Sequence, residues 1–201
     1  EISACLVGSE MCIRDRTKAM PANKVVTGEV RFSYAHVWEP DSINGSDPKY
    51  SVSILIPKSD TKTIDMIQKA IEAAKEMGKS EKFGGKIPAN LKLPLRDGDE
   101  DRPDDEVYSG HYFVNATSKT KPGIVDKNCQ PITDSTEVYS GCYGHASITF
   151  YPFNTNGNRG IACGLNNLMK TVDGEPLGGR SRAEDDFAGL VLEDEDDDFL
   201  N

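Results

Sequence analysis

The feature that most limits how this chain can fold is a two-residue alternation of apolar and polar side chains. It begins within residues 24–38, where alternate positions would share one face of a β-strand: Val30, Phe32, Tyr34, His36 and Trp38. Residues 50–56 and 107–119 repeat the pattern, and residues 138–153 predict a strand pair or one long bent strand. Short strands rich in aromatic residues indicate a mainly β protein.

One segment departs from this alternation and has helical spacing. After Pro57, apolar residues recur every three or four positions: Ile64, Ile67, Ala70, Ile71 and Ala74. Ser59 or Asp60 can cap the start of this helix, and Gly78 is predicted to end it. The polar residues 79–106 are predicted to form a long surface insertion, part of it disordered.

The element order is therefore strand, strand, helix, insertion and then several strands. Twisted, aromatic-rich strands with one helix favour a small closed barrel. We predict an oligonucleotide/oligosaccharide-binding (OB) fold with enlarged loops, and a β-sandwich is the alternative. The segment NTNGN at residues 154–158 predicts a hairpin turn between the last strands.

Charge is segregated along the chain. The formal net charge is −10, but residues 184–201 alone hold nine acidic residues and no Lys or Arg. Residues 97–106 hold seven acidic residues and one Arg, so the rest of the chain carries a formal charge of +5. A block of like charge predicts a disordered, solvated acidic tail. A mildly basic body with acidic appendages is typical of an anion-binding protein, and a merely solubilising tail is the simpler alternative.

The first nineteen residues do not fit this organisation. Residues 1–16 resemble translated read-through of a sequencing adapter, and their apolar part is too short and interrupted for a signal segment. Met20 is the better start. We therefore predict a non-native leader at 1–19, an OB-fold domain at 20–183 and the acidic tail at 184–201.

Several function classes find no support. No nucleotide-binding glycine loop, metalloprotease motif or serine-hydrolase motif is present, so we expect neither catalysis nor a cofactor. The acids of 97–106 favour a solvated loop, and a metal-dependent nuclease using Asp97 and Asp99 is the weaker alternative.

The five cysteines form no CxxC pair, which favours reduced thiols over a zinc site. No apolar run approaches the roughly 18 residues of a transmembrane helix, and we expect a cytoplasmic protein without a membrane partner.

Aromatic and basic residues recur on and beside the predicted strands. Unpaired nucleic acid is held by rings that stack on bases and by cations that follow the phosphates. If Ile148 faces the core, Tyr151 and Phe153 face outward. If Val114 faces inward, Phe113 points the other way. We predict a single-stranded DNA interface with these members: Arg31, Tyr34, Trp38, Tyr112, Phe113, Lys119, Lys121, Tyr151, Phe153 and Arg159.

Six segments extend this prediction to a family: FSYAHVWEP (32–40), YSVSILIPK (50–58), LPLRDGD (93–99), GHYFVNATSKTKPGIVD (110–126), EVYSGCYGHASITFYPFN (137–154) and GIACGLNNLMK (160–170). They resemble a family of phage proteins, long labelled a domain of unknown function and now associated with single-stranded DNA binding. That family is distantly similar to the replication single-stranded DNA-binding proteins of T-odd podoviruses. The resemblance covers about residues 22–190. It implies an OB fold, no catalytic activity, and an acidic C-terminal tail with an aromatic residue near its end.

In the family, that tail contacts replication partners and occupies the DNA groove when DNA is absent. For this chain, the resemblance implies that phage or host replication proteins bind the tail through Asp194, Asp196, Asp197, Asp198 and Phe199. Related tails often end on the aromatic residue, whereas Leu200 and Asn201 follow it here. A non-enzymatic phage assembly protein is the alternative function. The sequence leaves open a homodimer and a preference for RNA.

Overall fold

The computed structural model describes residues 20–42, 47–155 and 157–177. The predicted leader 1–19 and the predicted tail 184–201 lie outside the described residues. The elements follow in this order: β1 (Lys24–Val26), β2 (Val30–Asp41), β3 (Lys49–Pro57), α1 (Thr61–Glu81), β4 (Leu95–Asp97), α2 (Gly98–Asp101), β5 (His111–Ser118), β6 (Gly123–Val125), β7 (Tyr143–Thr155) and β8 (Asn158–Val172).

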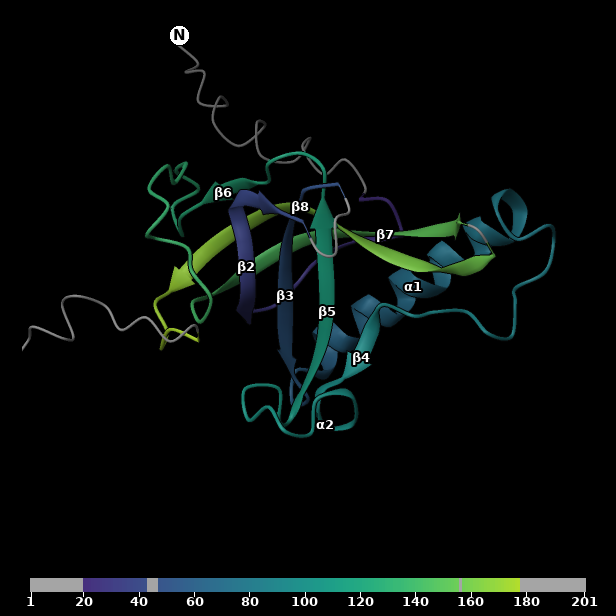
Figure 1. Cartoon of the computed structure of the whole chain (residues 1–201), viewed down its shortest axis with the longest axis horizontal. Helices are drawn as coiled ribbons and strands as arrows, with labels where there is room; N and C mark the ends of the chain where they lie inside the picture. Colours follow the sequence, from purple (N-terminus) through teal and green to yellow (C-terminus); the bar gives the residue numbers. More distant parts are fainter. Residues whose placement is uncertain (1–19, 43–46, 156, 178–201) are drawn as a thin grey trace, which may run out of the picture.

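Five strands close into a barrel (Figure 1). β2 pairs with β3, β3 with β5, β5 with β8, β8 with β7, and β7 with β2. The β5–β8 contact is parallel, and the other four contacts are antiparallel. β1 extends along β7, β6 along β8, and β4 along β5. The closed ring confirms the predicted mainly β barrel and decides against the sandwich.

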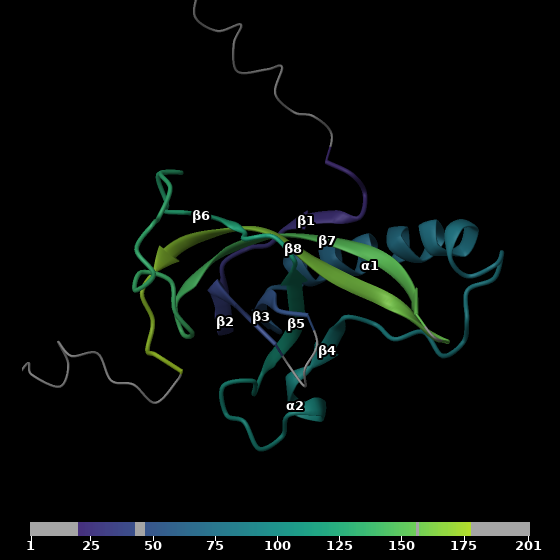
Figure 2. The same cartoon turned by 45° about the horizontal axis from the view of Figure 1, so that its top comes forward.

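The single long helix, α1, lies against one face of the β7–β8 hairpin (Figures 1 and 2). Asp60 caps it, as predicted, because its carboxylate accepts a hydrogen bond from the Thr63 N–H at 3.1 Å. The five apolar residues predicted from helical spacing are all buried. Neither helix in the described part of the chain is long and apolar enough to span a membrane.

The predicted end of this helix at Gly78 was wrong, because α1 continues to Glu81. Gly78 serves a contact instead of a terminus. A Cβ atom at this position would come within 2.7 Å of the side chain of Pro152 on β7. Only glycine therefore lets the last turns of the helix approach the hairpin this closely.

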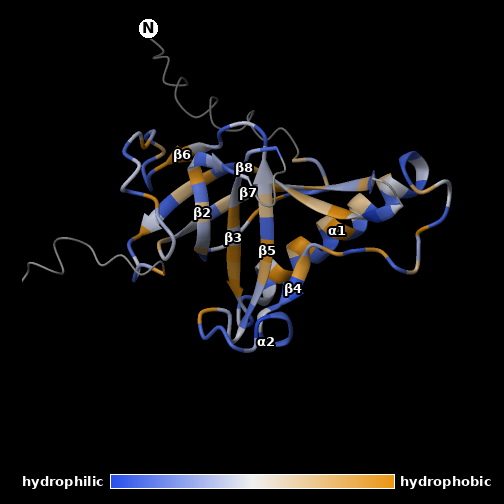
Figure 3. Cartoon of the chain, viewed as in Figure 1, coloured by the Kyte–Doolittle hydropathy of each residue, from blue (hydrophilic) through white to orange (hydrophobic). Residues whose placement is uncertain are grey.

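Alternate residues of the strands fill the barrel. On β3, Val52, Ile54 and Ile56 face the main core, and Leu55 on the other side is also buried, in a second cluster with Tyr108 and Phe113. On β7, Ile148 and Phe150 are buried as predicted, and they meet the apolar side of α1 in one core. Figure 3 shows the contrast between the hydrophobic half of β3 and the mostly hydrophilic loop around α2.

The alternation predicted for residues 30–38 fails in the middle of β2. The register with β3 slips by one residue between Ser33 and His36, which marks a β-bulge. Tyr34 lies in this bulge with φ of +47°. Beyond it Val37 is buried, whereas Tyr34 and His36 are exposed. The predicted common face was wrong because one extra residue moves all later side chains to the opposite face.

Candidate nucleic-acid interface

A row of mostly small side chains crosses the outside of the barrel. The strand register places each member directly opposite the next, in the order His36, Ser51, Thr117, Gly164 and Thr149. Cross-strand neighbours share one face of a sheet, so this row runs over all five barrel strands on the outer side. We call it the outer strip. Its small residues let an extended ligand approach the backbone closely.

Exposed aromatic rings lie at both ends of this surface. Tyr151 lies over the strip at the β7–β8 end, because a Cβ atom on Gly164 would be 3.3 Å from its ring. At the β2 end, Tyr34 follows Ser33, which lies opposite Ser53 in a neighbouring row. Tyr34 is 53% exposed and Tyr151 43% exposed. Both of these sequence-predicted rings therefore lie on the outside of the barrel, although they are far apart in the chain.

Three more predicted residues lie near the end of β5: Lys119, Lys121 and Trp38. Lys119 follows Thr117 by two positions, so it continues the same outward side of β5, and it is exposed. The ammonium group of Lys121 lies 4.9 Å from the ring centre of Trp38. Trp38 is half-buried, and its indole N–H donates to the Val138 carbonyl at 3.0 Å. This end of the surface therefore presents cations beside a fixed ring.

An arginine–aromatic cap formed by Arg102, Tyr34, Tyr108 and Phe113 covers the outer side of the barrel at Ser33 and Ser53, where the Tyr108 hydroxyl contacts both serines. The Arg102 guanidinium lies 4.6 Å from the ring centre of Tyr108, 5.3 Å from that of Tyr34 and 5.8 Å from that of Phe113. Tyr108 and Phe113 meet edge to face, with ring centres 5.0 Å apart. The sequence prediction did not include Arg102 or Tyr108, because Arg102 lies within the acidic run 97–106 and Tyr108 lies two residues after it.

This cap corrects the prediction for Phe113. Strand parity placed it correctly on the side opposite Val114, but its ring is completely buried against Leu55 and Tyr108. The segment after α2 folds back over that part of the outer face. Phe113 therefore cannot stack on a base, because Tyr108 and Arg102 occupy the space above it.

Arg31 is also engaged within the protein. Its guanidinium donates to the carbonyl oxygens of Gly141 at 3.2 Å and Glu175 at 2.9 Å. It also lies 5.5 Å from the ring centre of Tyr143. These contacts tie β2 to the loop before β7 and to the segment after β8. The prediction that Arg31 contacts DNA finds no support in this arrangement.

The remaining predicted residues lie away from the strip. Tyr112 is half-buried against the core, with the Lys58 ammonium 5.1 Å from its ring centre. Phe153 is half-buried and faces Gly160 across the β7–β8 hairpin. Arg159 is exposed near the tip of that hairpin. Phe153 therefore extends the outward face of Tyr151 towards the tip, whereas Arg159 pairs with Asn154 and lies on the other side of the hairpin.

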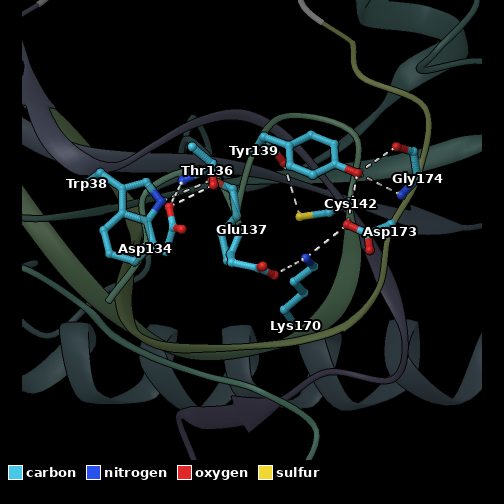
Figure 4. A network of polar contacts seen from close by, with 10 residues as sticks. Trp38, Asp134, Thr136, Glu137, Tyr139, Cys142, Lys170, Asp173 and Gly174 are labelled. Atoms are coloured by element: carbon cyan, nitrogen blue, oxygen red, sulfur yellow. Dashed lines mark hydrogen bonds and ion pairs between the residues drawn. The ribbon is translucent and has the colours of Figure 1, made fainter. Parts of the chain in front are cut away.

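A polar network fixes the walls beside this surface (Figure 4). The Lys170 ammonium lies 2.7 Å from Glu137 and 2.9 Å from Asp173. The Tyr139 hydroxyl donates to the Gly174 carbonyl at 2.8 Å and accepts from its N–H at 3.2 Å. The loop before β7 is thereby held against the segment after β8.

A lysine pairs with two carboxylates of the acidic run 97–106. The Lys58 ammonium lies 2.7 Å from Asp97 and 2.7 Å from Asp99. Hydrogen bonds to Asp97 and then to Asp99 raise the pKa of Lys58. In residues 20–42, 47–155 and 157–177, no group of three or more His, Cys, Asp or Glu is arranged to hold a metal ion. The nuclease alternative therefore gains no support from these acids.

The Asp99 carboxylate should contribute to the stability of the fold, and this contribution should be lost in acid. Its hydrogen bond from Lys58, followed by that from the Gly110 N–H, holds its pKa below the ordinary 3.8. A depressed pKa stabilises the folded state above the unfolded pKa, and this contribution is lost as pH falls through the folded pKa. Asp99→Asn should lower the free energy of unfolding at about pH 7 but change little below about pH 3, measured by urea denaturation. The same substitution at exposed Asp104 is the control, and an equal loss at both pH values would contradict this role.

A closed barrel whose outer face combines small residues, exposed rings and flanking cations is typical of proteins that bind single-stranded nucleic acid. The chain belongs to the family described as the ssDNA-binding protein of Enterobacter phage Enc34, which it matches over residues 23–200. The family predicted from the six sequence segments is therefore confirmed.

Individual relatives agree with this assignment. Protein p50 of Acyrthosiphon pisum secondary endosymbiont phage 1 is 31% identical over 186 residues, covering 87% of this chain and 97% of the relative. The single-stranded DNA-binding protein of bacteriophage Enc34, solved in complex with ssDNA, superposes with a TM-score of 0.70 at 27% identity, covering 78% of this chain and 90% of that one. The single-stranded DNA-binding protein gp2.5 of bacteriophage T7 superposes with a TM-score of 0.55 at 19% identity, covering 85% and 96%. At that identity, the T7 likeness supports the fold alone.

Proposed function

We propose that this protein binds single-stranded DNA along the outer strip during phage replication or recombination, in the host cytoplasm and without catalysing a reaction. The observation that carries the proposal is an outer strip of mostly small residues, accompanied by two exposed rings, Tyr34 and Tyr151, on the outside of the barrel. The structure of the Enc34 relative in complex with ssDNA supports the same ligand.

The physical roles follow from the side chains. Tyr151 and Tyr34 offer faces on which any base can stack, so no base sequence is required. Lys119 and Lys121 neutralise phosphates and release counterions. Gly164 leaves room for the strand beside Tyr151. The bound strand is thereby kept unpaired.

A gel-shift series tests the ligand. The full-length protein should retain single strands in preference to duplexes of the same sequence, and added magnesium should produce no cleavage. Affinity should fall with salt, with a log–log slope of about −0.7 for each phosphate neutralised. Failure to retain single strands at moderate salt would favour the assembly-protein alternative, and magnesium-dependent cleavage would favour a nuclease.

The acidic tail is proposed to compete with DNA for the same surface and to bind replication proteins once DNA displaces it. Support comes from the sequence, in which nine acids of residues 184–201 surround two aromatic residues, Phe187 and Phe199. A polyanion on a tether imitates the phosphates of the ligand and has a high effective concentration near the site.

Truncation after Arg182 should therefore raise the affinity for single strands, most strongly at low salt, where charge competition is least screened. Fluorescence anisotropy of a labelled oligonucleotide measures the change. A matched control keeps the full length and replaces the tail acids by Asn and Gln, which should raise affinity in the same way. Equal binding by truncated and full-length protein at low salt would end the competition proposal.

A further inference from the structure

A small cavity opens beside Tyr34, at the end of the surface where the arginine–aromatic cap lies. Its volume is about 130 Å³. An engineered cavity of about 150 Å³ accommodates benzene, so this one suits a single aromatic ring. Its lining combines apolar and aromatic residues with three polar ones: Tyr34, Tyr108, Leu177, Ser33, Ser140 and Asp105.

The cavity walls are held in place by hydrogen bonds. The Ser140 hydroxyl accepts from the Ala35 N–H at 3.0 Å, which leaves its own O–H available to donate. The Ser140 carbonyl accepts from the Leu177 N–H at 2.8 Å. The buried Tyr108 hydroxyl lies 3.1 Å from that of Ser53. A ligand would therefore meet a site whose walls are already ordered.

Asp105 supplies a negatively charged acceptor at this cavity. One carboxylate oxygen accepts from the Val107 N–H at 3.2 Å. The other lies 3.9 Å from the Arg102 guanidinium, which balances the charge but exceeds hydrogen-bond distance. Within the described part of the chain that second oxygen has no hydrogen bond, and the side chain is 35% exposed. The second oxygen can therefore accept a hydrogen bond from a ligand.

We propose that this cavity receives one cytosine base of the bound strand, with its exocyclic amine donating to Asp105. A carboxylate only accepts hydrogen bonds, and cytosine presents an N4 amine where thymine presents an O4 acceptor. A purine adds a second ring that exceeds the cavity volume. The inference rests on the proposed function, and it adds a base preference at one position to stacking that is otherwise indifferent to sequence.

An aromatic residue of the acidic tail is the other candidate occupant. The cavity adjoins residues 97–106, which carry seven acidic residues and one Arg. That charge repels DNA phosphates and the acidic residues 184–201 alike. The tail aromatics, Phe187 and Phe199, carry no hydrogen-bond donor for Asp105, whereas cytosine carries an amine donor, so the base is favoured.

The test compares the full-length protein on oligo(dC), oligo(dT) and oligo(dA) of equal length, by anisotropy at fixed salt and slightly alkaline pH. One charge-assisted hydrogen bond predicts that oligo(dC) binds about tenfold more tightly than oligo(dT). In Asp105→Asn, whose amide can also donate to thymine, the ratio should fall to about one. In Asp104→Asn, an exposed neighbour that does not line the cavity, the ratio should stay as in the native protein. The ratio is taken within each variant, so a general loss of folded protein does not imitate the effect.

Equal affinity for oligo(dC) and oligo(dT) in the native protein would overturn the cytosine pocket while leaving single-strand binding intact. A preference that persists in Asp105→Asn would also overturn it. Failure to bind any of the three oligonucleotides would contradict the proposed function itself, and the pocket with it.

Discussion

Replacing Tyr34 and Tyr151 together by alanine should weaken binding to single-stranded DNA by more than tenfold without unfolding the protein. Each stacked base contributes about 1–3 kcal/mol, equivalent to roughly 5- to 150-fold in affinity. Both rings are exposed, 53% for Tyr34 and 43% for Tyr151, so little packing is lost with them. Alanine at position 34 also keeps a Cβ atom at the positive φ of the bulge, so the backbone strain there is unchanged. Equilibrium anisotropy at one salt concentration measures the effect.

The matched control is the double substitution of Tyr34 and Tyr151 by phenylalanine. It keeps both π-faces and removes only the hydroxyl groups, so affinity should stay within about threefold of the native value. Thermal unfolding of the alanine variant checks that the barrel is intact. Native-like affinity of the alanine variant would show that DNA does not use this face.

Phe150→Ala should lower stability and leave DNA affinity unchanged, although Phe150 is the neighbour of Tyr151 on β7. Its ring is completely buried in the barrel core. Removing a buried phenylalanine costs about 3–5 kcal/mol through lost burial and the cavity left behind. Affinity per folded molecule should not change, because the ring points away from the outer strip. Urea denaturation measures the loss of stability. Titration with DNA at concentrations well above the dissociation constant gives the fraction of protein that can bind, so a loss of folded protein is separated from a loss of affinity.

Phe150→Leu is the graded control, since it leaves a smaller cavity and should cost less than half as much. Tyr151→Ala measured in parallel should change the free energy of unfolding by about 1 kcal/mol or less. If both alanine variants lost similar stability, the inward and outward assignment of β7 would be wrong.

Elements determined by local sequence could be predicted. The helix start at Asp60 follows from a side chain that bonds the first turn of its own helix. The two sides of β7 follow from an uninterrupted alternation, in which Ile148 and Phe150 are buried and Tyr151 is exposed. The hairpin around Gly157 likewise follows from its own turn residues.

The bulge at Tyr34 could not be predicted, because it is defined by a register with β3, and sequence periodicity carries no register. The prediction that the helix ends at Gly78 failed because this glycine allows a close contact with Pro152, which lies more than seventy residues later in the chain. Both errors arise from partners that are distant in the chain.

The candidate site shows the same division. Strand parity predicted that Tyr151 faces outward, and the resemblance of six sequence segments indicated a family of phage single-strand binders. The exposure of Tyr34 follows from the bulge, which parity did not predict. Only the tertiary structure could show that Tyr108 and Arg102 cover Phe113 and remove it from the accessible outer surface. Side-chain chemistry and alternation are local properties that the sequence carries. Which side chains become neighbours depends on strand pairing between segments that can lie more than a hundred residues apart, which only the tertiary structure decides.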